Sequence, residues 1–362
     1  MVATAFLLQD LKGCKMEKQF LQNFTLEELR ELMGKSGFPK FRATQIFKWI
    51  SKNTPFDRMS DLPKSFVETL KNDYIDIAIN IDKEFKSVDG SVKFLYRLCD
   101  GNIIEGIYMP HNYGDTICVS TQVGCSMGCA FCASGIGGLV RNLEPGEILG
   151  QIIAVNAWLK GKSKITNVVL MGSGEPLDNY ENVTKFIRLA NHADGLNISQ
   201  RNISLSTCGL CDKIVQLADE GYGVTLSVSL HATTDEHRQN LMPIAKRYSV
   251  AEIIKAVKYY FEKTGRRIIF EYSMVKGENM DFFDAKRLKE LTKGYPSHVN
   301  LIMLNPVKEK NVKGCTKEEA QRFLKRLNDM GVSATIRRSS GTDVGGACGQ
   351  LRRSVIKGKE NE

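Results

Sequence analysis

Three cysteines placed close together are the residues of this sequence best suited to chemistry. They are Cys125, Cys129 and Cys132, in the run Gly-Cys-Ser-Met-Gly-Cys-Ala-Phe-Cys. A 4Fe–4S cluster normally takes four thiolates, so a loop that supplies three leaves one iron open for a substrate. A structural zinc ion is the alternative, with Cys118 close enough in the sequence to be a fourth ligand. Zinc cysteines usually come as closely spaced pairs, so the triplet favours the iron–sulfur cluster.

Glycine-rich and polar residues at the ends of predicted strands form a second candidate group. In the run Gly-Ser-Gly-Glu-Pro, Gly174 lets the backbone approach a ligand and Glu175 could accept hydrogen bonds from an ammonium group. The other candidate binding residues at strand ends are Ser206, Ser229, Leu230, His231 and Asn305. Asn-Pro is also a common turn signal, and a single histidine is more often structural than catalytic. We therefore interpret this group as binding residues only.

Cys348 is the third candidate, in the glycine-rich run Gly-Gly-Ala-Cys-Gly-Gln-Leu. A spare buried cysteine would more naturally lie in an apolar strand. A thiol that must move between two positions suits a loop of this composition, so the sequence favours a reactive role for Cys348.

The bulk composition of the 362-residue chain is that of a globular protein with a sizeable core, with 42% hydrophobic and 25% charged residues. No apolar run approaches the roughly 18 residues of a membrane helix, and the opening apolar stretch is too short for a secretory signal. Ten cysteines in such a chain indicate metal or redox chemistry in a reducing, cytoplasmic compartment. The net charge of +9 favours a polyanionic partner such as RNA without requiring one.

Changes of pattern divide the chain into predicted parts. These are a poorly ordered extension (1–15), a helical accessory RNA-binding domain (16–80), a β-hairpin extension (81–112), an α/β domain (113–345) and a C-terminal segment with Cys348 (346–362). In the helical domain, Thr25 is a predicted N-cap with Glu28 as its capping-box partner, and Gly34 is a predicted stop. A plain helical bundle with a solvated basic face is the alternative for that domain. Asp100 and Gly101 are the predicted hairpin turn.

Strands and helices alternate through the α/β domain. The predicted strands are Ile117–Ser120, Val168–Met171, Ile203–Ser206, Val224–Leu230, Ile268–Tyr272, Val299–Leu304 and Ala334–Ile336. This alternation predicts βαβ units and a parallel sheet. About six such units predict a partial (β/α)6 barrel with its chemistry at the carboxyl ends of the strands.

Together, the runs Cys-Ser-Met-Gly-Cys-Ala-Phe-Cys, Gly-Ser-Gly-Glu-Pro, Ser-Leu-His and Ala-Cys-Gly-Gln-Leu resemble those of the RlmN family of radical S-adenosylmethionine (SAM) methyltransferases. The resemblance covers nearly the whole chain from about Met16. It implies a radical SAM partial barrel, a 4Fe–4S cluster on the three clustered cysteines, and SAM bound by the strand-end residues. Family members methylate C2 of an adenine in 23S ribosomal RNA and, in many cases, of an adenine in tRNA, so these RNAs are the expected partners.

The resemblance also implies a mechanism that uses two SAM molecules per turnover. One methylates Cys348 by displacement. The other is cleaved at the open iron, by an electron from a donor such as flavodoxin or ferredoxin, to a radical that removes hydrogen from this methyl group. The resulting carbon radical adds to the adenine and joins RNA to protein. Cys118 matches the family cysteine that attacks the sulfur of Cys348, frees the methylated base and leaves a disulfide. Glu105 matches a family carboxylate with a proposed proton-handling role.

Two other interpretations stay open. The related Cfr enzymes share the Ala-Cys-Gly-Gln-Leu run and methylate C8 of the same adenine; Pro176 favours the RlmN interpretation, because Cfr typically has alanine there. A non-catalytic zinc-containing or RNA-binding protein is the rival from another class, but it leaves the pair Cys118 and Cys348 unexplained.

The chain departs from the family pattern just before Cys348. Val344, Gly345 and Gly346 replace an Ile-Asp-Ala run, and the added glycine should loosen the loop. Cys208 and Cys211 form a C-x2-C spacing that the family does not require, and we interpret them as structural thiols. We expect a cytoplasmic monomer with no membrane contact.

Overall fold

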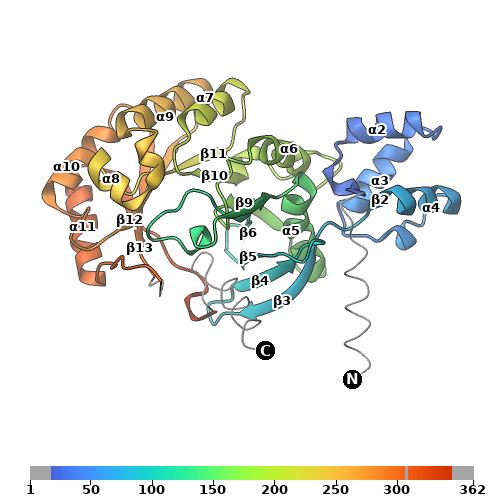
Figure 1. The fold of residues 1–362 in the computed structure, drawn as a ribbon, viewed down its shortest axis with the longest axis horizontal. Coiled ribbons are helices and arrows are strands. Elements are labelled where there is room, and N and C mark those ends of the chain that lie inside the picture. Colours follow the sequence, from blue (N-terminus) through green and yellow to red (C-terminus); the bar gives the residue numbers. More distant parts are fainter. Residues whose placement is uncertain (1–17, 306–308, 345–362) are drawn as a thin grey trace.

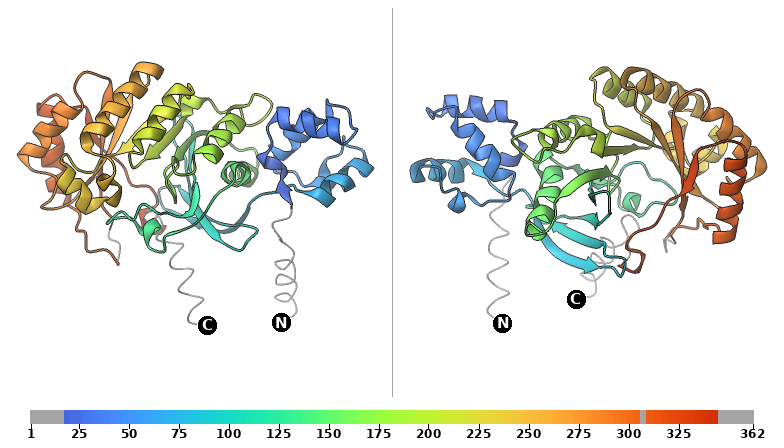
Figure 2. Two further views of the ribbon diagram at one scale, coloured as in Figure 1. Left: turned by 45° about the horizontal axis from the view of Figure 1, so that its top comes forward. Right: turned by 180° about the vertical axis from the view of Figure 1, so that it is seen from behind.

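The computed structural model describes residues 18–305 and 309–344, and Figures 1 and 2 show its fold. The predicted extension over residues 1–15 and the predicted catalytic Cys348 lie outside the described residues. Among the helices that these residues form, none has the length and apolar content needed to span a bilayer.

One ten-stranded sheet organises most of the chain. Its strands are β3 (Asn80–Lys86), β4 (Val92–Arg97), β5 (Ile103–Met109), β6 (Asp115–Cys118), β9 (Ile165–Leu170), β10 (Ile203–Thr207), β11 (Thr225–Ser229), β12 (Ile268–Met274), β13 (Ser297–Met303) and β14 (Ala334–Ile336). Strands β6 and β9 to β14 are parallel and lie in chain order, which confirms the predicted α/β partial barrel. Strands β3 to β5 are antiparallel and extend the same sheet through the β5–β6 pair.

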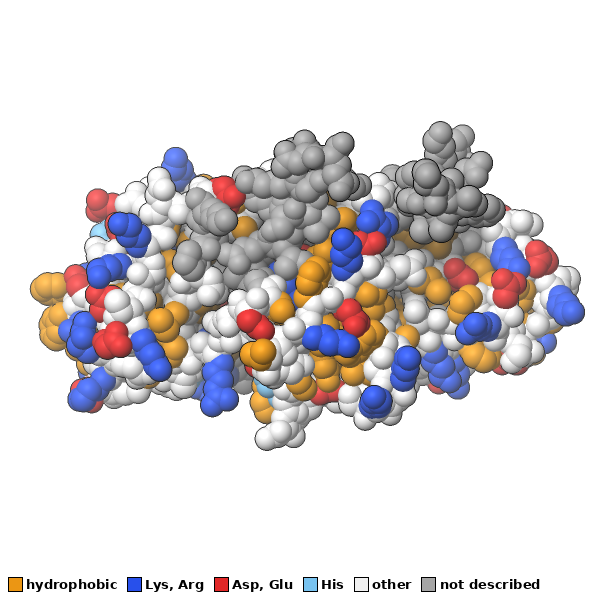
Figure 3. Space-filling model, turned by 90° about the horizontal axis from the view of Figure 1, so that it is seen from below, with side chains coloured by type: hydrophobic (Ala, Val, Ile, Leu, Met, Phe, Trp, Pro, Cys, Tyr) orange, Lys and Arg blue, Asp and Glu red, His pale blue; other side chains and the backbone are white. Residues whose placement is uncertain are grey.

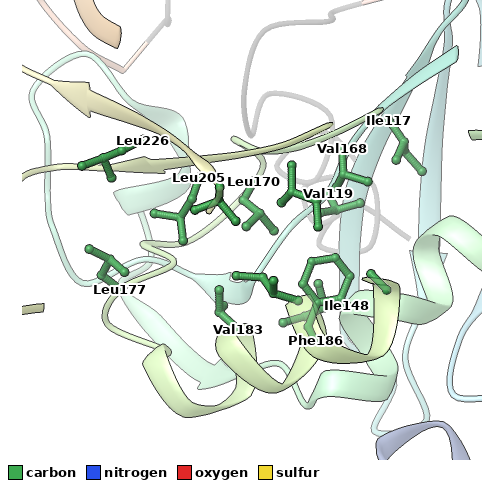
Figure 4. Close-up of a cluster of buried hydrophobic side chains, with 14 of the residues drawn as sticks. Ile117, Val119, Ile148, Val168, Leu170, Leu177, Val183, Phe186, Leu205 and Leu226 are labelled. Atoms are coloured by element: carbon green, nitrogen blue, oxygen red, sulfur yellow. The ribbon is translucent and has the colours of Figure 1, made fainter. Parts of the chain in front are cut away.

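Helices between the parallel strands cover the outer face of this curved sheet (Figure 1). They are α5 (Pro145–Trp158), α6 (Tyr180–Asn191), α7 (Cys211–Asp219), α8 (Asp235–Leu241), α9 (Val250–Thr264), α10 (Phe282–Leu291) and α11 (Lys317–Asp329). Figure 4 shows the packing, with Ile117, Val168 and Leu170 from the sheet against Ile148 and Phe186 from the helices. Each such buried side chain contributes about 1.5–3 kcal/mol relative to exposure. This core holds the strand ends in fixed positions.

The N-terminal helical domain stands beside the barrel (Figure 2). Its helices are α2 (Leu26–Lys35), α3 (Arg42–Ile50) and α4 (Lys64–Asp73), and a short parallel pair joins β1 (Gln19–Phe20) to β2 (Tyr74–Ile75). The predicted capping box is confirmed, because Thr25 and Glu28 each accept a hydrogen bond from the other's backbone N–H. Helix α2 continues one residue past the predicted stop, to Lys35.

Polar contacts at the start of α5 join this domain to the barrel. The Asn23 amide donates to Glu144, and its oxygen accepts from the Gly146 N–H at 2.7 Å. A Cβ at Gly146 would lie 2.8 Å from that Asn23 oxygen, so glycine permits the close approach. Gln22 is buried at the same junction and bonds both Ile50 and Ala78.

Candidate active site

The three clustered cysteines lie on a loop that a small antiparallel sheet closes at its base. Strand β7 (Gln122–Gly124) pairs with β8 (Leu139–Asn142), and the Cys125 N–H donates to the Gly138 carbonyl at 3.1 Å. A Cβ at Gly135 would lie 3.2 Å from the Gly128 Cα, so the loop folds tightly on itself there. All three cysteines are half-buried and free.

The cysteine thiols sit close enough to affect one another electrostatically. Burial, with the nearby Cys132 thiol adding to it, raises the pKa of Cys125 and of Cys129 to about 12. Both thiols are therefore protonated at neutral pH in the free protein. A positively charged metal centre reverses this, because metal binding displaces the proton from a thiol. Three such thiols on one loop suit a 4Fe–4S cluster as ligands.

Across residues 18–305 and 309–344, no three His, Cys, Asp or Glu side chains are grouped so that they could hold one ion. A cubane cluster differs in its demands, because each thiolate binds a different iron. The assignment of these ligands stays a prediction from their spacing.

The Gly-Ser-Gly-Glu-Pro run lies against the start of the cysteine loop. A Cβ at Gly174, where φ is +108°, would lie 2.6 Å from the Gln122 Cβ, so only glycine fits. Glu175 is 4% exposed, and burial raises the pKa of its carboxyl group. Its oxygens accept backbone N–H bonds from Leu177 at 3.0 Å and from Cys208 at 2.7 Å. A carboxylate has further lone pairs, so it can also accept from an ammonium group.

Strands β10 and β11 bring the next predicted residues to the same edge of the sheet. Ser206 and Ser229 are half-buried near the carboxyl ends of their strands, and the buried Leu230 follows directly. Asn305 follows β13 and is exposed. The parallel order of these strands is what places all four residues at one end of the barrel. Their contact with a ligand stays a prediction.

His231 connects the end of β11 to the cysteine loop. Its ring lies edge-on to Phe131, with 4.8 Å between the ring centroids. Its Nδ1 accepts from the Ser273 N–H at 2.9 Å, which leaves the ring proton on Nε2. Burial, with Arg238 nearby, lowers the pKa of His231 to about 3, so the ring is neutral at physiological pH. The residue is 4% exposed with φ of +56°, a backbone shape held by its surroundings.

Arg238, which the sequence analysis did not single out, ties two of these strand ends together. It is fully buried and donates to the carbonyls of Cys208 at 2.6 Å, Leu230 at 3.2 Å and Ser229 at 3.3 Å. A further bond reaches the Tyr248 carbonyl at 3.4 Å. An arginine in a polar helical stretch is expected at the surface, so the sequence holds no signal for this role.

The inner face of β4, β5 and β6 carries the predicted Glu105 and Cys118. Ile107 lies opposite Cys118, and the side chains of Glu105 and Ile107 share a face because they are two residues apart. The other face packs against α5, where Tyr108 lies beside Trp158. Glu105 is 5% exposed and forms an ion pair with Lys93, another residue that the sequence analysis missed.

The residues just before the Cys348 segment are held at the tip of the β3–β4 hairpin. The Asp343 carboxylate accepts from the Ser87 hydroxyl at 2.5 Å and from the Val88 N–H at 3.1 Å. The Gly341 N–H donates to Asp89 at 3.0 Å. These bonds attach the chain leading to Cys348 to the β3–β4 hairpin, and β4 pairs with β5, which carries Glu105.

Comparison with known proteins agrees with this arrangement. Residues 119–288 match the radical SAM superfamily, and residues 20–75 match the ribosomal RNA large subunit methyltransferase N-terminal domain. A Clostridium perfringens protein named "Probable dual-specificity RNA methyltransferase RlmN" is 53% identical over 93% of this chain and 97% of its own length. A protein of the same name from Lachnoclostridium phytofermentans is 45% identical over 93% of this chain and 95% of its own length.

A solved structure extends the similarity to the fold. The crystal structure of a radical SAM methyltransferase from Sphaerobacter thermophilus matches with a TM-score of 0.88 and 39% identity, over 92% of this chain and 98% of that one. The match includes both the helical domain and the barrel, because it covers nearly all of each chain. The chain therefore belongs to the RlmN family of radical SAM RNA methyltransferases.

Proposed function

We propose that this radical SAM methyltransferase methylates C2 of an adenine in the peptidyl transferase centre of 23S ribosomal RNA, and an adenine in the anticodon loop of tRNA. The observation that carries the proposal is the match to dual-specificity RNA methyltransferases along nearly the whole chain. The site geometry supports it, because the cysteine loop, Glu175 and His231 adjoin one another at one end of the barrel.

The cofactors of this family are a 4Fe–4S cluster and SAM, two molecules of which are used per turnover. When bound, the cluster supplies the electron that starts radical chemistry on SAM. Cys125, Cys129 and Cys132 would hold it, and the ring of Phe131, which lies on the same loop, contacts His231. Glu175 would accept from the SAM ammonium group.

The strand ends complete the SAM site. Ser206, Ser229, Leu230, His231 and Asn305 would contact the adenosyl group, because they lie at or just after the carboxyl ends of parallel strands of one sheet. His231 is suited to this because its neutral ring keeps one N–H donor and buries no charge. The neighbouring β10 and β11 ends keep their spacing through Arg238.

The remaining chemistry belongs to two thiols and a carboxylate. Cys348 carries the methyl group that becomes linked to the adenine. Cys118 then attacks the sulfur of Cys348: the S–S bond forms, the bond from that sulfur to the substrate carbon breaks with its electron pair on the carbon, and a proton taken up there completes the methyl group. The unpaired electron that radical addition leaves on the adduct would return to the cluster, when bound. Glu105 accepts the proton that the adenine carbon loses. Its place on the face of Cys118 supports this division of roles.

RNA binding extends beyond the barrel in this proposal. The helical domain has a cavity lined by Lys48, Trp49 and Lys52 together with Thr44, Gln45 and Asp61. Cations beside an aromatic ring suit phosphate and base contacts. Figure 3 shows further Lys and Arg side chains along the length of one face. We also propose a monomer in the cytoplasm that takes electrons from a flavodoxin or ferredoxin.

Nucleoside mass spectrometry tests the proposal. The protein is reconstituted anaerobically with iron and sulfide, then supplied with SAM, a reductant and an rRNA fragment. We expect 2-methyladenosine from the wild type and from Cys315→Ala, a matched control at a half-buried cysteine, and none from Cys348→Ala. 8-Methyladenosine would assign the Cfr reaction instead. No methylated adenosine from a protein that carries zinc and no iron would overturn the enzymatic proposal.

A further inference from the structure

Lys93 and Glu105 form an ion pair that is almost completely removed from water. Lys93 Nζ lies 3.0 Å from Glu105 Oε2, and the two side chains are 1% and 7% exposed. Leu95 lies opposite Glu105, and Lys93 is two residues from Leu95, so both charged side chains project from the same face of the sheet. Cys118 is on this face too, because Ile107 on β5 lies directly opposite Lys93 on one side and directly opposite Cys118 on the other.

Stability gives no sufficient reason for this pair. Removing an ammonium or a carboxylate from water costs several kcal/mol per ion, and replacing a buried ion pair by packed apolar residues is often neutral or stabilising. The adjacent positions on the same face, Leu95 and Ile107, are apolar. The sheet could therefore carry apolar residues at positions 93 and 105 as well. A role at the site explains the pair better.

The ammonium group fixes where the Glu105 carboxylate lies. A general base must lie within hydrogen-bond reach of the proton that it removes, so the position of this carboxylate matters for the reaction. The contact restrains the side chain, because Oε2 is held at hydrogen-bond distance from Nζ.

We propose that Lys93 is a positioning residue, which holds the Glu105 carboxylate in the orientation required of the proton acceptor in the methyl-transfer step. This inference rests on the proposed function, in which Glu105 handles a proton of the RNA–protein adduct. One proton passes from the adduct carbon to Glu105, and the two electrons of the broken C–H bond stay on the adduct. Lys93 acts in this step through its contact with Glu105.

Other charged groups near this face contact Glu105 less directly. On β3, Lys83 lies opposite Leu95 and is exposed. On β4, Arg97 points to this face and forms an ion pair with Asp82. Asp89 and Asp343 lie at the exposed hairpin tip, where they hold Gly341 and Ser87. Water screens exposed charges, so these groups act on Glu105 more weakly than the buried Lys93 does.

A single-turnover experiment separates this role from a structural one. Enzyme already methylated on Cys348 is mixed with RNA, SAM and reductant, and the rate of methyl transfer is followed. For Lys93→Met we expect transfer to fall about 10- to 100-fold, because Glu105 loses the contact that orients it. Methylation of Cys348 by SAM, measured separately, should change less than about threefold, because Glu105 takes no part in it. Lys93→Arg should restore the rate of transfer.

Two further variants keep the test decisive. Lys93→Gln shortens the side chain and removes the charge, so we expect the same fall in transfer rate from it if Lys93→Met does not fold. In an E105Q background, adding K93M should cost less than about twofold, because Lys93 acts through Glu105. An unchanged rate of methyl transfer in the folded Lys93→Met or Lys93→Gln variant, or a tenfold further loss in the E105Q background, would overturn the inference. Failure of the wild type to make 2-methyladenosine would instead count against the proposed function.

Discussion

Replacement of Arg238 by methionine tests how the barrel holds its strand ends. The guanidinium is fully buried and donates four hydrogen bonds to backbone carbonyls, of which only the bond to Cys208, at 2.6 Å, is short. A hydrogen bond from a charged group contributes about 1.5–3 kcal/mol to stability. We count each of the three longer bonds at about half the contribution of a neutral hydrogen bond. The expected loss for Arg238→Met is therefore about 3–5 kcal/mol in the free energy of unfolding.

Thermal melting and SAM binding together measure this loss. A destabilisation of that size corresponds to a fall of about 4–7 °C in Tm for a chain of this length. SAM affinity should fall as well, because the Cys208 and Ser229 carbonyls lie beside the candidate binding residues. Arg247→Met is the matched control: Arg247 is nine residues along and 66% exposed, and its ion-pair distance to Asp212 is 3.7 Å, so we expect a change below about 0.5 kcal/mol.

The reasoning would be refuted by an Arg238→Met protein that melts within about 2 °C of the wild type and binds SAM normally. Equal destabilisation of the Arg238 and Arg247 variants would refute it too. Arg238→Lys should fall between wild type and methionine, because lysine keeps the charge but cannot reach all four carbonyls with its compact ammonium group.

Three more predictions concern the thiols, His231 and Gly174. In the cluster-free protein at pH 7.5, Cys125 and Cys129 should react with iodoacetamide much more slowly than a free cysteine, because their raised pKa of about 12 keeps them protonated. Their reaction should become faster as the pH rises. Rapid alkylation at pH 7.5, detected by mass spectrometry, would contradict this. His231 has a folded pKa of about 3, below its unfolded value, so its contribution to stability is complete above about pH 6.5 and is lost as pH falls toward 3. Between pH 7.5 and pH 5, His231→Gln should lose about 2 kcal/mol less than the wild type in urea unfolding, and equal losses would count against the burial argument. Gly174→Ala should weaken SAM binding measured by calorimetry and lower the free energy of unfolding by about 2–4 kcal/mol, because the added Cβ would meet Gln122. Gly161→Ala is the control: Gly161 also has a positive φ, but its Cβ would meet nothing within 4 Å, so this variant should bind SAM normally.

Local patterns in the sequence predicted much of this fold. The capping box of Thr25 and Glu28 depends on residues three apart, and the structure contains it. The alternation of strands and helices after residue 113 predicted the parallel sheet, because a connection of helix length returns the chain to a parallel neighbour. The hairpin turn at Asp100 and Gly101 was predicted from a dipeptide, and Gly101 has φ of +82° there.

Tertiary structure was needed for the contacts between distant segments. Glu175 was predicted as a ligand of an ammonium group, and the fold adds that its oxygens hold the backbone of Leu177 and Cys208. No spacing rule connects Cys208 to Glu175, because the contact exists only where β9 and β10 end side by side.

The sequence alone predicts the chemistry of this chain, because the thiol triplet, the glycine-rich runs and the thiol of Cys348 are local arrangements of residue types. The side chains that support these candidate residues became visible in the fold. Lys93 reads as a surface lysine and Arg238 as a helix-surface arginine, yet both are buried. The reason is physical: strand register and helix packing determine whether a charged side chain meets water or a buried partner, and neither is encoded by the residues next to it.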